Sequence, residues 1–213
     1  GPGPEYGDGG TVMRHAPVGI AIVLAVAVGA GVTLYERSHD PPTLRAGTAI
    51  PNPRRIADFT FIDEDRRPFD RKNLEGRWSL LFTGFTHCPD VCPTTIALMA
   101  ELRRKISRDD LQFVFVSVDP ERDTPEVVAA YLAHFDPALV GATGTRAEME
   151  RFTAALGLAQ VRNPGAGGDY TVDHSTALVL IDPKARIAGY FQAPHDRDAI
   201  AADLAALGGD SPL

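Results

Sequence analysis

The chain holds two cysteines, Cys88 and Cys92, and both lie in one short segment, FTGFTHCPDVCPTT. Three residues separate them, which lets the two sulfur atoms meet in a disulfide or around one metal ion. A disulfide at this spacing closes a very small ring and constrains the unfolded chain little, so stabilisation is a poor reason for it. The pair therefore indicates redox chemistry or part of a metal site, and two cysteines that only fill space are the alternative.

A helix start next to the pair favours thiolate chemistry. Pro93 disfavours a helical conformation at Cys92 and is suited to begin a helix, so we expect residues 88–92 to form a loop or an isolated turn that leads into a helix at Pro93. Free N–H groups and the dipole at a helix N-terminus stabilise a thiolate. Both sulfurs are then available as nucleophiles or as ligands.

A third ligand is offered by His174 in the segment YTVDHSTALVLID, 82 positions after Cys92. In the predicted topology, the strand that follows this histidine starts near the cysteine segment. Two thiolates and one imidazole form a soft set that suits copper, whereas a structural zinc site normally has four protein ligands. A histidine that is only packed, and a dithiol oxidoreductase, which more often has a Cys-x-x-Cys motif, remain alternatives.

The remaining histidines are assigned lesser roles. His87 adjoins the first cysteine and either ligates the metal or points away from it. His134 is expected to cap the end of a helix, and His195 lies at a helix start, where a structural or surface role is expected. His15 and His39 flank the apolar N-terminal segment.

Strand and helix patterns alternate from residue 54 onward. Near-continuous apolar runs, WSLLFTGF and LQFVFVSVD, are typical of strands buried on both faces. The expected elements in chain order are a hairpin (ADFTFIDED with RRPFD), the strand WSLLFTGF, the helix TTIALMAELRRKI, the strand LQFVFVSVD, the helices DTPEVVAAYLAHF and TRAEMERFTAALG, the hairpin STALVLID with RIAGYFQ, and the helix DRDAIAADLAAL. Asp123 or Thr124 is expected to cap the helix that Pro125 begins, and Gly157 to end the following one.

This order predicts an α/β chain with the thioredoxin-like fold, in which a mixed sheet is flanked by helices. Strands that alternate with helices imply a parallel core, and the closing hairpin makes the sheet mixed. The cysteine pair follows the first core strand, at the carboxyl edge where ligand sites of such sheets lie. The Gly-rich segment NPGAGGDY, 163–170, is predicted to be a flexible loop that lets His174 swing.

The N-terminal part is predicted to anchor the domain in a membrane. Residues 16–35 carry no charge and would span roughly 30 Å as a helix, the thickness of a bilayer core. A cleaved signal peptide, with Ala25-Val26-Ala27 as its cleavage site, is the alternative, but the apolar run continues past this site. The flanking positive charges do not decide the orientation.

The chain accordingly divides into four parts. Residues 1–15 are expected to be disordered, with 1–12 either native or an added remnant. Residues 16–35 form the transmembrane anchor, 36–53 a Pro-rich tether, and 54–213 the folded domain. The net charge of −7 argues against nucleic acid as a partner.

Three motifs in this order and spacing, GFTHCPDVCPTT, SVDPERDTPE and VDHSTALVLIDP, resemble the Sco/SenC family of copper-binding assembly proteins for cytochrome c oxidase. The resemblance covers about residues 54–207 and extends to the anchor. It implies a thioredoxin-like fold that binds one copper ion, as Cu(I) or Cu(II), through Cys88, Cys92 and His174.

The resemblance also implies a biological role. A membrane-anchored metallochaperone of this family would assist assembly of the CuA centre in cytochrome c oxidase subunit II, with a copper donor chaperone and a thiol reductant as further partners. The domain would face the periplasm from a bacterial inner membrane, or the intermembrane space from the mitochondrial inner membrane. Oxidation of the cysteine pair would remove both thiolate ligands and release the ion.

Three aspartates near these ligands are candidates for tuning the site. Asp90 lies between the cysteines, and Asp173 lies beside His174. Asp119 ends a core strand, where it could orient a ligand, dock a partner or simply form the turn into a helix.

The main alternative function is a membrane-tethered thiol-disulfide reductase that keeps the cysteines of the CuA site reduced. One cysteine of the pair would then attack and the other resolve. The absence of a Thr-x-x-Cys motif around Cys88 argues against a peroxidase of the same fold. A sensor of copper or redox state is a further alternative, and the metallochaperone, which is not an enzyme in the usual sense, is the function that we predict.

Overall fold

The computed structural model of the chain describes residues 1, 3, 22–23, 25–29, 42–106, 108–165 and 170–208. The chain forms two compact units, Gly1–Asp40 and Pro41–Leu213. In the first unit, the described part of the predicted anchor is helical, and the rest of that anchor and most of the predicted disordered segment lie outside the described residues. Within the described ranges, no helix is both long enough and apolar enough to span a bilayer.

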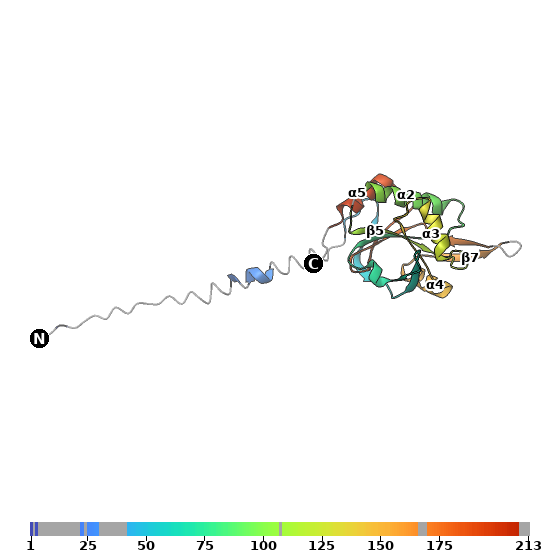
Figure 1. The fold of residues 1–213 in the computed structure, drawn as a ribbon. Coiled ribbons are helices and arrows are strands. Elements are labelled where there is room, and N and C mark those ends of the chain that lie inside the picture. The colour runs from blue at the N-terminus through green and yellow to red at the C-terminus, as the bar shows by residue number, and fades with distance from the viewer. Residues whose placement is uncertain are drawn as a thin grey trace. The chain divides into compact units, whose positions relative to one another are not determined.

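The second unit consists of short strands and helices that follow the predicted alternation (Figure 1). In chain order they are β1 (Thr48–Arg55), β2 (Thr60–Asp63), β3 (Pro68–Asp70), the 3-10 helix η1 (Arg71–Leu74), β4 (Trp78–Gly84), α2 (Val91–Lys105), β5 (Leu111–Ser117), α3 (Pro125–Ala133), β6 (Val140–Thr143), α4 (Arg146–Ala155), β7 (Gln160–Pro164), β8 (Tyr170–His174), β9 (Leu178–Ile181), β10 (Arg186–Phe191) and α5 (Arg197–Ala206).

Strands of this unit form an eight-stranded sheet in the order β1-β10-β9-β4-β5-β6-β2-β3. The pairs β4–β5 and β5–β6 are parallel and the other pairs are antiparallel. The sheet is therefore mixed, which confirms the predicted thioredoxin-like arrangement of strands and helices. A second sheet contains β7 and β8, which pair antiparallel.

Two apolar clusters cover the two faces of the large sheet. In the fully buried strand β4, Leu80 and Phe82 belong to the cluster under α2, α3 and α5, whereas Leu81 belongs to the cluster under α4. Successive side chains of a strand point to opposite faces, so both faces of β4 are covered. This arrangement explains the continuous apolar run in the sequence, and Figure 1 shows α2 and α5 on the side of the sheet opposite α4.

Helix ends follow the predicted capping chemistry in two cases. The Thr124 side chain accepts a hydrogen bond from the N–H of Val127 and caps α3, in which Pro125 is the first residue. Gly157, with φ of 71°, follows the last residues of α4 in the left-handed conformation that glycine favours. Asp123, the other predicted cap, is fully buried and has a different role.

The start of α2 corrects one prediction. The helix begins at Val91, so Cys92 lies inside its first turn instead of in a loop before Pro93. A proline in the first turn costs a helix no hydrogen bond, because N–H groups there have no partner within the helix. The helical conformation of Cys92 therefore prevails over the steric preference of a residue that precedes proline.

The boundary between tether and domain also lies earlier than predicted. Residues 48–53 of the predicted tether belong to β1, which pairs with β10 and has a register irregularity between Ala49 and Arg54. The buried carboxylate of Asp203 accepts hydrogen bonds from the backbone N–H groups of Arg45 and Ala46 at 2.8–2.9 Å. Prolines are compatible with an edge strand, so the Pro-rich composition misled the prediction.

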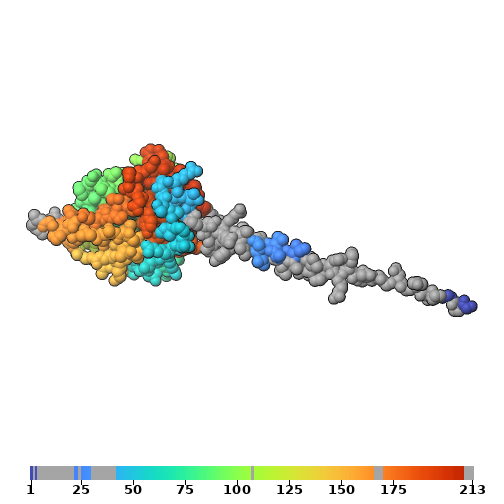
Figure 2. Space-filling view, turned by 180° about the vertical axis from the view of Figure 1, so that it is seen from behind, coloured from blue at the N-terminus to red at the C-terminus, as the bar shows by residue number. Residues whose placement is uncertain are grey.

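The predicted loop 163–170 is in part a hairpin. Asn163 and Pro164 end β7, and Tyr170 begins β8, while residues 166–169 lie outside the described residues. Figure 2 shows the orange hairpin projecting at the edge of the domain beside the segment that contains α4. The hairpin carries His174 at its last position.

Candidate metal centre

Three predicted ligands come together at the carboxyl end of β4. The ligating atoms of Cys88, Cys92 and His174 all lie within 4.8 Å of one another. The Cys92 Sγ atom is 3.1 Å from His174 Nε2, and both cysteines are free thiols. Cys88 is partly exposed and Cys92 is buried. The fold thus joins residues that are 82 positions apart into one cluster with three metal-binding atoms.

The cysteines are positioned by the turn between β4 and α2. The Cys88 N–H donates to the carbonyl of Phe85, and the Cys92 N–H points at the Cys88 Sγ atom at 3.5 Å. Gly84, the last residue of β4, lies so close that a Cβ atom there would be 2.8 Å from Cys92 Sγ. The missing side chain of Gly84 is what leaves room for the second sulfur.

His174 is held in a tautomer that suits metal binding. Its Nδ1 atom lies 3.0 Å from the carbonyl oxygen of Ser175, which can only accept a hydrogen bond, so Nδ1 carries the proton. The lone pair of Nε2 then faces Cys92. Metal-binding histidines typically donate their other ring N–H in this way. The rings of Phe82 and Phe85 pack edge-on against the imidazole, with centroids 5.7 and 5.8 Å away.

Desolvation favours the neutral forms of Cys92 and His174 before a metal binds. Desolvation raises the pKa of the Cys92 thiol and lowers the pKa of the His174 imidazole, because a low-dielectric environment disfavours the charged form of each. The imidazole can therefore accept a metal without first losing a proton. The Cys92 thiol must release its proton as a metal binds.

A buried carboxylate that the sequence did not reveal fixes the cysteine turn. Asp123 accepts hydrogen bonds from the Thr86 N–H at 2.9 Å and the Thr86 hydroxyl at 2.6 Å. It also accepts one from the hydroxyl of Ser117 at 2.6 Å. Thr86 lies two residues before Cys88, so Asp123 holds the turn that presents the first thiol. One feature of the sequence could have indicated this role. Asp123 in SVDPERDTP is followed by Thr124, which is itself suited to cap the helix, so Asp123 was available for another contact.

Other predicted residues lie around the cluster. The ring of His87 is 55% exposed, and its Nδ1 atom faces the Thr86 hydroxyl at 3.0 Å, so it is not among the three clustered ligands of the described chain. His134 caps α3 as predicted, and its Nδ1 atom is 2.6 Å from the carbonyl of Ala130. His195 approaches the carbonyl of Thr176 before α5, in agreement with a structural role.

Three predicted tuning aspartates have different surroundings. Asp90 is exposed at the N-cap of α2. Asp173 is exposed on the outer face of β8, where it accepts a hydrogen bond from the Asn163 side chain at 2.7 Å. Asp119 is 3% exposed and contacts the hairpin that carries His174. Of the three, Asp119 has the contacts that could position a ligand.

A groove of about 880 Å³ runs beside the cluster, between the start of α2 and the turn before α5. Its lining includes Asp90, Val91 and Pro93 from the first element and Pro194 and His195 from the second. The Val91 side chain, adjacent to Cys92 in sequence, is 40% exposed there. The groove therefore offers a partly apolar surface that includes the sequence neighbours of Cys92 but none of the three clustered ligands.

Comparison with known proteins gives consistent matches over the second unit. The SCO1/SenC family model matches residues 48–208. The human mitochondrial protein SCO1 homolog is 40% identical over 139 residues, which cover 63% of this chain and 46% of that protein. The structure of Arabidopsis thaliana ScoI with copper bound has 34% identity and a TM-score of 0.66, and covers 70% of this chain and 94% of its own. Copper-bound ScoI of Bradyrhizobium japonicum has 36% identity and a TM-score of 0.66, with 70% and 97% covered.

Proposed function

The chain belongs to the SCO1/SenC family, and on that premise we propose that it binds one copper ion through Cys88, Cys92 and His174 and delivers it to the CuA centre of cytochrome c oxidase subunit II. The observation that carries the proposal is the convergence of the three ligating atoms within 4.8 Å. Solved relatives that contain copper support the choice of metal. The acceptor follows from the family resemblance of the three sequence motifs.

The donor set fits copper on chemical grounds. Thiolate sulfur and imidazole nitrogen are soft to intermediate ligands, and Cu(I) accepts such ligands at low coordination number. Zinc in a structural site would normally take a fourth protein ligand, and the cluster in the described chain has three. A site with three ligands also leaves the metal accessible for transfer, which a carrier needs.

Loading and release follow from the different exposure of the ligands. Cys92 is buried, whereas Cys88 and His174 are both partly exposed, and the Cys92 proton leaves as copper binds. Of the two thiols Cys88 is the one that is partly exposed, so we expect it to be the thiol that an acceptor protein reaches first. Oxidation of the two copper-bound thiolates to a disulfide, with two electrons passed to a partner disulfide that takes up two protons from solvent, removes both sulfur ligands. Reloading then needs a dithiol reductant.

The proposal also includes the position of the chain in the cell. Residues 16–35 serve as a transmembrane anchor, and the domain faces the periplasm of a bacterium or the intermembrane space of a mitochondrion. Leu44 already packs against the domain, so the tether is the short segment that precedes it. The groove beside α2 is where subunit II docks, because it is partly apolar and its lining residues Val91 and Pro93 flank Cys92 in the sequence.

A thiol-disulfide reductase for the CuA cysteines is the second candidate. One observation favours it: the partly exposed Cys88 and the buried Cys92 have the relative exposure of an attacking and a resolving thiol. In this function His174 would be dispensable.

The two functions are separated by incubating the copper-loaded chain with an apo CuA domain whose cysteines are either reduced or joined in a disulfide. Delivery predicts that copper is found in the reduced acceptor after the two proteins are separated, and that this transfer is lost for His174→Ala. Appearance of acceptor thiols without copper transfer, unchanged in His174→Ala, would instead establish the reductase.

A further inference from the structure

The strand that carries His174 is attached to the domain in an unusual way. Among the strands that the structure describes, β8 pairs only with β7, and the two form a sheet separate from the eight-stranded one. Figures 1 and 2 show this hairpin at the edge of the domain. Backbone ladder hydrogen bonds to the main sheet therefore do not fix where the ligand lies. Its position depends on the short link to β9, which begins at Leu178, on the packing of the imidazole against the rings of the β4 end, and on side-chain contacts along β8.

One face of β8 faces the domain. Tyr170, Val172 and His174 alternate with the exposed residues Thr171 and Asp173, as the period of a strand requires. Val172 is 9% exposed and packs in the same apolar cluster as the cysteine segment. Tyr170 and His174 thus lie on one face at opposite ends of a single strand.

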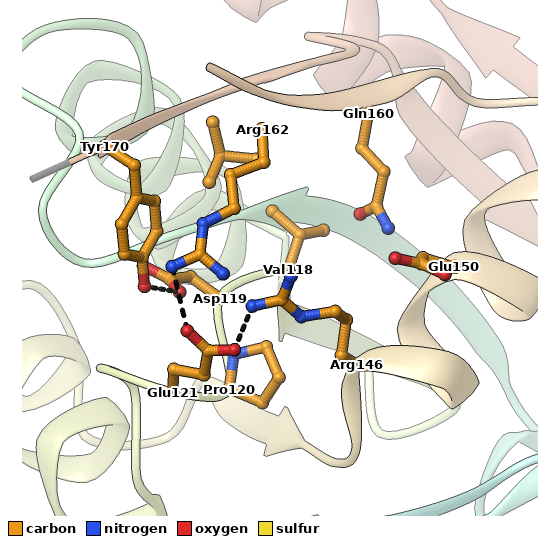
Figure 3. Close-up of a pocket in the computed structure, with 10 residues that line it drawn as sticks. Val118, Asp119, Pro120, Glu121, Arg146, Glu150, Gln160, Arg162 and Tyr170 are labelled. Carbon is orange, nitrogen blue, oxygen red and sulfur yellow. Dashed lines mark hydrogen bonds and ion pairs between the residues drawn. The ribbon is translucent and has the colours of Figure 1, made fainter. Parts of the chain in front are cut away.

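Tyr170 is clamped at its end of the strand. Its hydroxyl donates a hydrogen bond to Asp119 Oδ1 at 2.6 Å. The guanidinium groups of Arg122 and Arg162 lie 3.9 and 3.3 Å from the centroid of its ring. Figure 3 shows the phenol directed at Asp119 and the Arg162 side chain beside the ring, with Arg162 paired to Glu121 at 2.8 Å. The Arg122 Nη1 atom also donates to the Tyr170 carbonyl at 3.2 Å.

Asp119, which accepts the hydrogen bond from Tyr170, is itself held by several contacts. It is 3% exposed, and its carboxylate also receives a hydrogen bond from Arg122 Nε. Its backbone N–H donates to the Ser117 hydroxyl at 3.0 Å, and that hydroxyl donates to Asp123. Asp123 in turn holds the cysteine turn through Thr86. One turn after β5 therefore supports both halves of the metal cluster.

We propose that the hydrogen bond from Tyr170 to Asp119 is a latch that positions His174 against the two cysteines. Tyr170 and Asp119 are positioning residues, since they act on the metal through the strand and do not ligate it. The proposal rests on the proposed copper function for its consequence, but the placement of the imidazole can be measured without metal.

The phenol is suited to act as a permanent donor. Burial and the nearby Asp119 carboxylate raise the pKa of Tyr170 to about 12, so the hydroxyl keeps its proton at physiological pH. Removing only the phenol oxygen would leave the Tyr170 ring between the two guanidinium groups. Val172 would stay in the core. A Tyr170→Phe chain should therefore fold, with a strand that is less firmly fixed.

The test compares Tyr170→Phe with Tyr190→Phe in the full chain. Tyr190 donates an equally short hydrogen bond, 2.6 Å, to the carbonyl of Leu156, and its ring packs in the cluster on the opposite face of the sheet. Amide hydrogen exchange is first measured without metal. We expect faster exchange over residues 170–175 in Tyr170→Phe, and exchange like the wild type in that segment for Tyr190→Phe.

Copper affinity is then measured by competition for Cu(I) with a chromophoric chelator under reducing conditions. We expect Tyr170→Phe to bind about tenfold more weakly, the scale seen when a contact that orients a ligand is lost. Asp119→Asn, which keeps an oxygen acceptor, should bind more tightly than Asp119→Ala. Combining Tyr170→Phe with Asp119→Ala should weaken binding little beyond Asp119→Ala alone, because both changes break one interaction.

Each outcome decides between the proposals. Unchanged exchange and affinity in Tyr170→Phe, or equal losses in both tyrosine variants, would overturn the latch and leave the copper function standing. A wild-type chain that binds no copper would refute the copper function, and the exchange rates measured without metal would still show whether Tyr170 holds the strand of His174.

Discussion

At the scale of single residues, Gly84 has a role that depends on its missing side chain. A Cβ atom at this position would lie 2.8 Å from Cys92 Sγ and about as close to two phenylalanine rings. We expect Gly84→Ala to displace the sulfur, to weaken copper binding, and to cost about 1–3 kcal/mol of stability through overpacking.

Gly144→Ala is the matched control for this change. Its Cβ atom would meet Phe61 at 2.7 Å, in the cluster on the other face of the sheet. Chelator competition and urea unfolding of both variants separate the two effects. If both lose stability and affinity in parallel, the contact of Gly84 with Cys92 has no specific role in the metal site.

The two thiols should also differ in reactivity. Cys88 is partly exposed, whereas Cys92 is buried and burial raises its pKa, so its reactive thiolate form is scarce. We expect iodoacetamide to modify Cys88 well before Cys92 in the reduced chain without metal. Peptide mass spectrometry over a time course measures the order, and equal rates would contradict the exposure that supports Cys88 as the outer ligand.

The residues with direct chemistry could be predicted from the sequence, and their supports could not. Cys88 and Cys92 were identifiable because they are the two cysteines of the chain, whereas His174, one of six histidines, was singled out by a segment that resembles the Sco/SenC family. Either Asp123 or Thr124 was predicted to cap the helix, and Thr124 has that role, while Asp123 holds Thr86. Such roles depend on contacts between residues far apart in sequence, which residue type alone does not encode.

At the scale of elements, β1 ties the N-terminal edge of the domain to its C-terminal half. It pairs with β10, and the backbone that leads into it donates to Asp203 in α5. A chain that begins at residue 54 would lose most of β1 and leave β10 as an exposed edge, which favours aggregation.

We therefore expect a chain beginning at Pro41 to unfold at a higher temperature than one beginning at residue 54, and to stay monomeric at higher concentration. Calorimetry and light scattering provide the comparison, and the Asp203→Ala variant of the longer chain should lose part of the difference. Equal melting temperatures for the two lengths would show that β1 contributes no stability.

Sequence patterns predicted the inner elements of the sheet better than its edges. The strands β4 and β5 were evident because both faces are buried and nearly every residue is apolar. The edge strand β1 and the hairpin of β7 and β8 lack such runs, since much of each is exposed. Their positions are set by pairing partners and by contacts such as the one between Tyr170 and Asp119.

At the scale of the whole molecule, copper loading should depend on redox state. Joining Cys88 and Cys92 in a disulfide leaves His174 as the one remaining protein ligand of the cluster. We expect the chain oxidised with a small disulfide to retain little copper after desalting, and dithiothreitol to restore binding. Copper retention by the oxidised chain equal to that of the reduced chain would contradict the release mechanism.

The most direct test of the account is the copper content of the reduced full chain, measured by atomic absorption together with its Cu(I) affinity. His174→Ala and Cys88→Ser are compared with His134→Ala, which alters an exposed histidine that caps α3 and lies outside the cluster. The account predicts one copper per chain, an affinity weakened sharply by either ligand change, and no effect of the control. Little copper in the wild type, or binding indifferent to His174, would contradict it and leave Cys88 and Cys92 as a redox pair.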